Sequence, residues 1–469
     1  MTAFGSLTRR QLKFTVRVKP LSPVHIGVGN EFLGRGAYHL YDENRRLALV
    51  SPRPLAAALL DHFGDQAVTH VPKLMQSDQY PPKVATQIEN GTLSVRRMDV
   101  HPGAVPHLLD TGRNGGLKVM TSQANGLPYI PGSSLKGALR TAWLDWQTQQ
   151  KGSYTRFAEE VARTKLRGRD ADDDLMDLFQ ATPHLVGLEN KVRAERKTYP
   201  NRDVFRAVQV SDLLPSRIGT LTKAYSVLSM SYDADPEEGY TRPSDSGKAG
   251  SQAWECLDYS ADVEYAGTIT VDMSLLDQLL AKDDRQKAKY PDVYQLVDAL
   301  KRPQMWSEAI SAYGQRFYSA ELQHYEGLRE RPLQRRKGIR IHDGGRQQLV
   351  LDWIKDPKRE NLASRLLPLG MGVGLMAHTL LGAFNPNFDG ENPDSAEYLG
   401  DEQYFDTTLT GEVLKSGKPN NGFAYLPSPK SRRVTGEFPD SGRRQGSYTT
   451  MQAERPLGWT ELTLEVMPS

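Results

Sequence analysis

The order of strand and helix patterns along the sequence predicts an α+β fold rather than a parallel doubly wound sheet. Apolar and polar residues alternate over 12–18, which is the pattern of a half-buried strand. Two short strands are expected at 37–41 and 47–50, followed by a helix over 53–63 that stops at Gly64. A strand, a hairpin and then a helix is typical of an α+β sandwich.

The rest of the chain continues this mixture of elements. Residues 65–128 are rich in proline, glycine and polar side chains, so they are expected to form an insertion or long hairpin. The stretches 231–252 and 383–422 are expected to be loops. Further helices are predicted at 133–149, 274–282 and 292–328, and further strands at 204–210, 263–271 and 459–466.

Composition places the chain among ordinary soluble proteins. With 469 residues it has room for two or three modules, each with its own core. No apolar run approaches the roughly 20 residues that cross a bilayer, and the first 13 residues lack the apolar core of a signal peptide. The single cysteine excludes an intramolecular disulfide and a cysteine-based metal site. These features predict a cytoplasmic protein.

Positive charge is segregated along the sequence although the net charge is only +2. Lysines and arginines gather at 191–206, 335–346 and 430–444, and acidic residues gather at 170–177. Such clusters can form a basic surface for nucleic acid on a nearly neutral protein. Solvated loops with incidental charge are an equally simple interpretation.

The start of the predicted helix at 133 has a pattern that suits a phosphate group. Gly132 lets the backbone approach closely, and Ser133 or Ser134 can cap the helix. The free N–H groups of a first turn attract anions. Lys136 and Arg140, four residues apart, share one face and can reach the same phosphate. A capped helix start with exposed basic side chains is the structural alternative.

A glycine run precedes an apolar stretch near the carboxyl-terminal third. Gly370, Gly372 and Gly374 alternate with other residues, but the spacing matches neither a dinucleotide fingerprint nor a Walker loop. A loop lying along a polynucleotide backbone and a glycine-mediated tight packing both remain open.

Signals for catalysis and metal binding are weak. The ten histidines are scattered without metal-ligand spacing, and the acidic run Asp172 to Asp174 is typical of a solvated face, so no metal is expected. His25, between two β-branched residues, can act as a general acid or base in RNA cleavage or can pack within its loop. The aromatic signature of RNA-recognition strands is absent, so contacts with RNA are expected on phosphates and 2′-hydroxyls.

Four segments together resemble one family. Residues 22–29, Ser-Pro-Val-His-Ile-Gly-Val-Gly, resemble the N-terminal motif of the RAMP superfamily of CRISPR systems. Residues 129–140 resemble its second hallmark, 206–212 its internal strand ending in Ser-Asp, and 369–374 its glycine-rich loop. The carboxyl-terminal segments 427–433 and 456–459 are similar to the ends of the crRNA 3′-end capping subunits of type III-A (Csm) effectors.

The resemblance implies two ferredoxin-like modules of the RNA-recognition type with long insertions. The first is expected over residues 1–212 with an insertion at about 65–128. The second is expected over 213–469 with a helical insertion at about 273–360. This fold class remains α+β.

The resemblance also implies a non-catalytic subunit that binds crRNA, caps the backbone of a type III-A (Csm) complex and is needed for crRNA maturation in antiviral defence. The implied partners are crRNA, the third Csm subunit, visiting cellular nucleases and, through the guide, target RNA; no cofactor or membrane is implied. The catalytic aspartate of the backbone subunits has no counterpart in residues 28–37, where Glu31 is the only acid. The alternatives are a metal-independent endoribonuclease that uses His25 and Lys136, and an end subunit of another type III subtype.

The residues expected to contact RNA belong to the two glycine-containing loops, the helix start and three arginines. They are His25, Gly27, Gly29, Gly132, Ser133, Ser134, Lys136, Arg140, Arg206, Gly370, Gly372, Gly374, Arg432 and Arg433.

Overall fold

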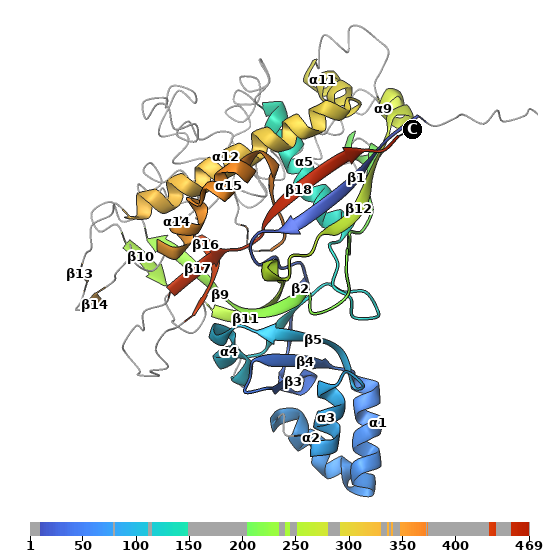
Figure 1. Cartoon of the computed structure of the whole chain (residues 1–469), viewed down its shortest axis with the longest axis vertical. Coiled ribbons are helices and arrows are strands. Elements are labelled where there is room, and N and C mark those ends of the chain that lie inside the picture. The colour runs from blue at the N-terminus through green and yellow to red at the C-terminus, as the bar shows by residue number, and fades with distance from the viewer. Residues whose placement is uncertain are drawn as a thin grey trace, which may run out of the picture.

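An antiparallel sheet, a larger mixed sheet and the helices packed on them dominate the computed structural model (Figure 1). The structure describes residues 10–77, 80–110, 115–148, 204–233, 240–243, 251–279, 291–329, 335–336, 339–340, 348–371, 373, 431–437 and 452–468. Helices α1 to α3 lie at one end of the molecule, and the long helix α12 runs along the other.

The first sheet is built around the amino-terminal strand. Strand β1 (Gln11–Pro20) lies between β12 (Tyr265–Asp272) and β18 (Trp459–Val466), and both neighbours are antiparallel to it. At one edge, β7 (Val208–Val210) and β8 (Leu214–Pro215) both pair with β12. At the other edge, β15 (Leu366–Pro368) pairs with β18. The order β15-β18-β1-β12-β7 joins strands from both ends of the chain.

Two long helices form a core with this sheet. They are α5 (Gly132–Thr148) and α12 (Pro303–Arg329), the latter preceded by α9 (Met273–Leu279) and α11 (Pro291–Leu300). Phe14 of β1 lies 5.4 Å from Trp306 of α12, and Trp306 lies 5.3 Å from Trp143 of α5, as ring centroids. The first pair is tilted and the second is edge-to-face, and aromatic contacts of this kind add to the free energy gained by burial.

The second sheet has ten strands in the main order β2-β6-β11-β9-β5-β4-β3. Strand β9 is the longest of them, and β10, β11 and β16 all pair with it while β17 pairs with β16. The bounds are β2 Gly27–Leu33, β3 Tyr38–Tyr41, β4 Arg46–Val50, β5 Ser94–Val100, β6 Leu117–Met120, β9 Thr222–Asp233, β10 Tyr240–Pro243, β11 Ser251–Leu257, β16 Ser431–Glu437 and β17 Gln452–Pro456. A separate pair is formed by β13 (Arg335–Arg336) and β14 (Ile339–Arg340).

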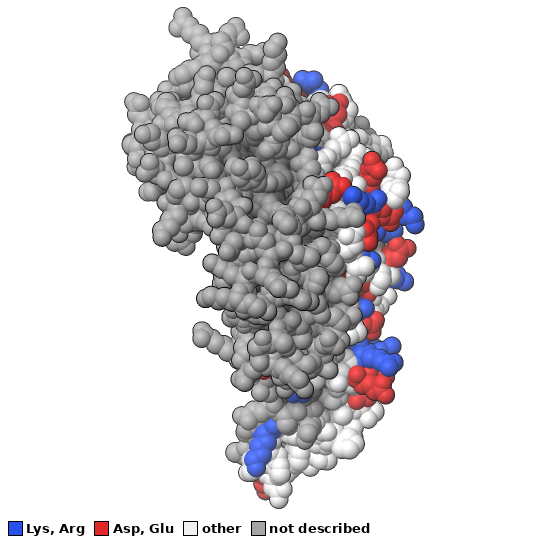
Figure 2. All heavy atoms as spheres, turned by 90° about the vertical axis from the view of Figure 1, so that its left-hand side faces the viewer, with Lys and Arg blue, Asp and Glu red and all other residues white. Residues whose placement is uncertain are grey.

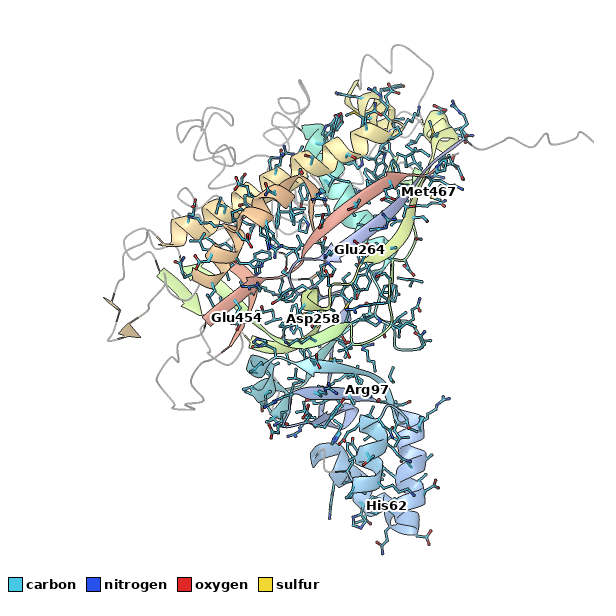
Figure 3. The ribbon with its side chains drawn as sticks, viewed as in Figure 1. His62, Arg97, Asp258, Glu264, Glu454 and Met467 are labelled. Atoms are coloured by element: carbon cyan, nitrogen blue, oxygen red, sulfur yellow. The ribbon has the colours of Figure 1, made fainter. Side chains whose placement is uncertain are left out.

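Small helices flank the second sheet. Helices α1 (Pro52–Phe63), α2 (Ala67–Ser77) and α3 (Pro82–Glu89) share a core with β4, and α4 (Val105–Leu109) packs near β11. In Figure 3, His62 marks the tip of this helical end, Arg97 lies on β5, and Met467 lies at the opposite end of the molecule.

Many predicted elements are confirmed. The strands at 12–18, 37–41, 47–50 and 459–466 and the helices at 53–63 and 133–149 are present within two residues of their predicted bounds. The strand predicted at 263–271 is β12. Local alternation and clear stop signals explain this agreement, because these elements bury one face along their whole length.

Other predictions are wrong. Residues 65–128, predicted to form an insertion or long hairpin, contain α2, α3, β5, α4 and β6, so they are not a simple hairpin. The predicted loop at 231–252 contains strand residues at both ends. Residues 204–210 begin with a 3₁₀ turn, and the helix predicted at 292–328 is broken before Pro303. The elements within 65–128 and 204–210 are short and give weak periodicity. The helix at 292–328 is broken because Pro303 cannot donate the hydrogen bond that a continuous helix requires.

Strand pairing does not follow the predicted division at residue 212. Strand β1 pairs along its length with β12 and β18, which lie on the far side of that boundary. The acidic run at 172–174 and the loop predicted at 383–422 lie outside the described residues. No described helix is long and apolar enough to cross a membrane.

Candidate functional site

Three loops that are distant in the sequence meet at the end of β1. The backbone N–H of Trp459 donates to Ser22 Oγ at 2.9 Å, and the N–H of Ser22 donates to the Trp459 carbonyl at 3.2 Å. Gly458 N donates to the Pro23 carbonyl at 2.8 Å. The motif at 22–29 and the carboxyl-terminal motif at 456–459 therefore hold each other through reciprocal hydrogen bonds.

The glycine-rich loop is the third member of this junction. Met371 N donates to the His25 carbonyl at 2.7 Å, and Leu369 N donates to the Gly458 carbonyl at 2.8 Å. Gly370 has φ +91°, and a Cβ there would lie 2.5 Å from the His25 carbonyl oxygen. Close packing thus requires glycine at 370, whereas Gly372 and Gly374 lie outside the described residues.

His25 is buried at the centre of the junction. Its Nδ1 lies 2.6 Å from the Glu255 carbonyl oxygen, and its ring centroid lies 4.8 Å from that of Trp254. Burial is the largest influence on the ring and lowers the pKa of His25 to about 4. The ring is therefore neutral at pH 7, with Nδ1 as the donor and Nε2 as an acceptor that has no hydrogen-bond partner among the described residues.

Gly27 is required by the same histidine. A Cβ at Gly27 would lie 2.6 Å from His25 Nε2, closer than any side chain tolerates. Gly29 lies in β2, which pairs with β6 through a register shift between Gly27 and Phe32. The glycine at 27 therefore has a packing role in the described structure.

A buried carboxylate stabilises the adjacent strand. Glu255 accepts from Thr222 Oγ1 at 2.9 Å and from the backbone N–H of Met120 at 2.9 Å. The guanidinium of Arg96 pairs with the same carboxylate. Each oxygen is therefore engaged, as a buried charge requires. Asp258, which follows β11, lies midway between the two sheets in Figure 3 and accepts from the Tyr225 hydroxyl at 3.0 Å.

Cations gather on the other face of β11. Lys118 Nζ lies 4.8 Å from the Trp254 ring centroid, and Arg433 Cζ lies 5.1 Å from the same centroid. Lys118 is 4% exposed, and its Nζ donates to Met371 Sδ of the glycine-rich loop at 3.0 Å. These three residues are called the indole cluster: Lys118, Trp254 and Arg433.

The second predicted motif is placed elsewhere on the first sheet. Gly132 N, at the start of α5, donates to Asp212 Oδ1 at 2.8 Å, so a carboxylate already caps the helix. A Cβ at Gly132 would lie 2.3 Å from the Val210 carbonyl oxygen. Ser134 N donates to the Pro131 carbonyl at 3.0 Å. The helix start therefore joins the motifs at 129–140 and 206–212.

The basic side chains near this helix start differ in exposure. Ser133 and Arg206 are exposed, while Lys136 and Arg140 are half-buried on α5. Arg432 lies on β16, beside the exposed Arg433. The structure thus brings His25, Gly27, Gly370 and Arg433 together and groups Gly132 to Arg140 with Asp212.

Sequence reasoning missed Lys118 and Trp254. Lys118 lies on the four-residue strand β6, in a stretch predicted to be irregular, and Trp254 carries no motif. Only knowledge of the pairing, in which Trp254 is opposite Lys118 across two parallel strands, shows that they meet. In the side view of Figure 2, Lys and Arg atoms alternate with Asp and Glu atoms along the described edge.

Among the described residues, no group of three or more His, Cys, Asp and Glu side chains is placed to hold a metal ion. The fold and the loop junction thus define an α+β protein whose family motifs serve as packing and joining elements. The sequence matches the family model of the RAMP superfamily over residues 17–343. The chain belongs to the RAMP superfamily.

Two solved structures are similar in fold. One is a chain of the cryo-EM structure of a Csm–crRNA–target RNA ternary complex in a type III-A CRISPR-Cas system, with a TM-score of 0.51 and 20% identity, covering 96% of this chain and 100% of that one. The other is the crystal structure of T. onnurineus Csm5, with a TM-score of 0.47 and 18% identity, covering 95% and 99%. No curated protein matches the sequence.

Proposed function

We propose that the chain is a non-catalytic crRNA-binding subunit of a type III-A (Csm) effector complex. The observation that carries the proposal is the junction of two RAMP motifs, 22–29 and the glycine-rich loop, with the carboxyl-terminal motif at 456–459, beside the two cations of the indole cluster. The fold likeness over the whole chain to a subunit of a crRNA-bearing complex supports it. In this proposal the subunit caps the backbone at the crRNA 3′ side and is needed for crRNA maturation.

The state of His25 favours binding over cleavage. A general acid or base must come within hydrogen-bond reach of the RNA, and His25 has 0% exposure with Nδ1 already engaged by the Glu255 carbonyl. A pKa near 4 also means that at pH 7 the ring lacks the second, acidic proton that a general acid would give. The endoribonuclease alternative therefore has no support from the described residues around His25.

Part of the finer fold prediction also belongs to this proposal. The elements β1, α5, β7, β12, α12 and β18 follow one another as βαββαβ, and their strands lie in the antiparallel order β18-β1-β12-β7. This is the connectivity of a ferredoxin-like module, assembled here from both ends of the chain. The second sheet contains parallel pairings between β5 and β9 and between β6 and β11, which a ferredoxin-like sheet lacks. The connectivity therefore supports one of the two predicted ferredoxin-like modules.

The proposed partners follow from this role. The chain would contact crRNA directly, a backbone subunit of the Csm complex (the third Csm subunit) at its neighbouring surface, and target RNA only through base pairing with the guide. Trimming of the crRNA 3′ end would be the work of visiting cellular nucleases, and the complex would act in the cytoplasm against invading nucleic acid.

Co-expression tests the proposal. The tagged chain is purified with its backbone subunit, and the ends of the bound RNA are sequenced. We expect bound crRNA with ragged or trimmed 3′ ends, and loss of the subunit should lengthen or disperse those ends. Recovery of the complex with identical crRNA ends in the presence and absence of the chain would contradict a role at the 3′ side.

A further inference from the structure

The indole cluster is built by neighbouring strands of the second sheet. Phe32, Lys118 and Trp254 lie opposite one another across β2, β6 and β11, so their side chains share one face. Arg433 on β16 is opposite Ser229 of β9. Ser229 lies two residues beyond Val227, which is opposite Gln252 of β11. The cations therefore come from strands separated by more than three hundred residues, and the sheet fixes their positions.

The ammonium group of Lys118 is poorly compensated. Its described hydrogen-bond partner is the thioether of Met371, which is a weak acceptor for a group with three donors. A cation–π contact with Trp254 adds a favourable interaction. Lys118 as a residue is only 4% exposed, and a charged side chain buried to this extent is stable only when further polar or anionic groups meet it.

No carboxylate acts on either cation within the described part of the chain. Burial and the neighbouring Arg433 lower the pKa of Lys118, and burial lowers the pKa of Arg433. Glu255, next to Trp254 in sequence, faces the opposite side of β11, and its oxygens are taken by Arg96, Thr222 and the Met120 N–H. The two positive charges thus share one indole, and no carboxylate among the described residues neutralises them.

A third basic group lies against the same ring. The His25 ring centroid lies 4.8 Å from that of Trp254 with the ring planes tilted by 47°, and its Nε2 is buried without a described hydrogen-bond partner. Both cations help to keep this ring neutral. Nε2 can accept a hydrogen bond but carries no negative charge, so the imidazole does not neutralise the two cations. Lys118 and Arg433 therefore have no anionic partner among the described residues, and an incoming anion would supply one.

Arg433 is the exposed member of the indole cluster, and the other two members are buried. Arg433 is exposed and provides access from solvent, whereas Trp254 is 3% exposed. A nucleobase cannot stack on an indole that the protein already covers. The ligand that fits is a compact anion that enters from solvent beside Arg433 and contacts the buried Lys118.

We propose that Lys118 and Arg433, held over Trp254, form a binding site for a phosphate group of the RNA backbone. The proposal rests on the function proposed above. It adds Lys118, which no sequence motif indicates, and gives the predicted RNA contact Arg433 a defined partner. Lys118 acts as a fixed point charge, and Arg433 supplies the planar donors that suit phosphate oxygens.

The salt dependence of RNA binding tests the site. A fluorescent single-stranded RNA is titrated with the purified full chain at several KCl concentrations, for the wild type and for Lys118→Met with Arg433→Met. Single-stranded RNA binding loses a slope of about 0.7 in log K against log salt for each phosphate contact removed. We expect the double variant to lose about 0.7 if one phosphate is held and about 1.4 if two are held.

Matched variants separate the site from general charge. Lys83→Met with Arg53→Met removes the same two charges from exposed positions on α3 and α1, and should leave the slope unchanged. Arg433→Met alone, at an exposed position, should lower the slope even if Lys118→Met prevents folding, and Arg433→Lys should restore most of it. An equal loss of salt-dependence slope in the two double variants would show that Lys118 and Arg433 do not form a specific phosphate site.

The remaining outcomes are also decisive. If the wild-type chain fails to bind RNA, the proposed function fails and the site fails with it. If the wild type binds and the indole-cluster variants, folded by circular dichroism, keep the wild-type slope, the function stands and this site is wrong.

Discussion

His25 Nδ1 lies 2.6 Å from the carbonyl oxygen of Glu255, and this contact fastens the first RAMP motif to strand β11. The backbone of the same histidine accepts from Met371 of the glycine-rich loop. One residue therefore links three segments that are hundreds of positions apart. Its side chain serves the architecture of the site, since its polar atoms face protein on all described sides.

The neutral state of His25 predicts how stability depends on pH. Its folded pKa of about 4 is below the unfolded value of 6.5, so the unfolded chain takes up the extra proton as pH falls between them. This contribution, on the order of 3 kcal/mol, is present above pH 6.5 and is lost toward pH 4. Urea unfolding of the wild type and His25→Gln at pH 7.5, 6 and 5 should show a difference that shrinks with acidity. A pH-independent difference would rule out this account.

Gly370 should tolerate no side chain. The Gly370→Ala variant would place a Cβ 2.5 Å from the His25 carbonyl oxygen at φ +91°, so we expect a loss of stability of about 1–3 kcal/mol. Gly34→Ala is the matched control, because a Cβ at Gly34 meets nothing within 4 Å. Denaturant midpoints measure both. Equal effects of the two substitutions would show that the loop is not packed as described.

Two glycines of α5 should respond in opposite directions. Gly137 faces open space within the helix, so Gly137→Ala should stabilise the chain by about 0.5–1 kcal/mol. Gly132→Ala should destabilise it, because the new Cβ would lie 2.3 Å from the Val210 carbonyl oxygen. Thermal unfolding of the two variants checks the sign. If both substitutions stabilise the chain, the described close approach of α5 to β7 is wrong.

Asp212 should act as the cap of α5. Asp212→Ala removes the acceptor that lies 2.8 Å from Gly132 N and should cost about 0.5–2 kcal/mol. Because a carboxylate at this position repels phosphate, Asp212→Asn should leave RNA binding equal or stronger. Weaker RNA binding by a well-folded Asp212→Asn would mean that this helix start contacts the ligand in another way.

Local patterns predicted the elements whose burial repeats along one strand or helix. Leu12, Phe14, Val16 and Val18 are buried in alternation, and Trp459 begins the strand expected at the carboxyl-terminal end. The motifs were also recognised, but several of their glycines have packing roles. Lys118 and Trp254 could not be predicted, because their meeting depends on a parallel pairing between β6 and β11 that leaves no local periodicity.

The central claim, that this subunit holds crRNA and does not cut it, is tested most directly by one incubation. Labelled precursor crRNA is mixed with the purified chain, with and without EDTA, and both the retained fraction and the length of the retained RNA are measured. We predict retained RNA of unchanged length under both conditions. Specific cleavage that disappears in His25→Ala would contradict the account.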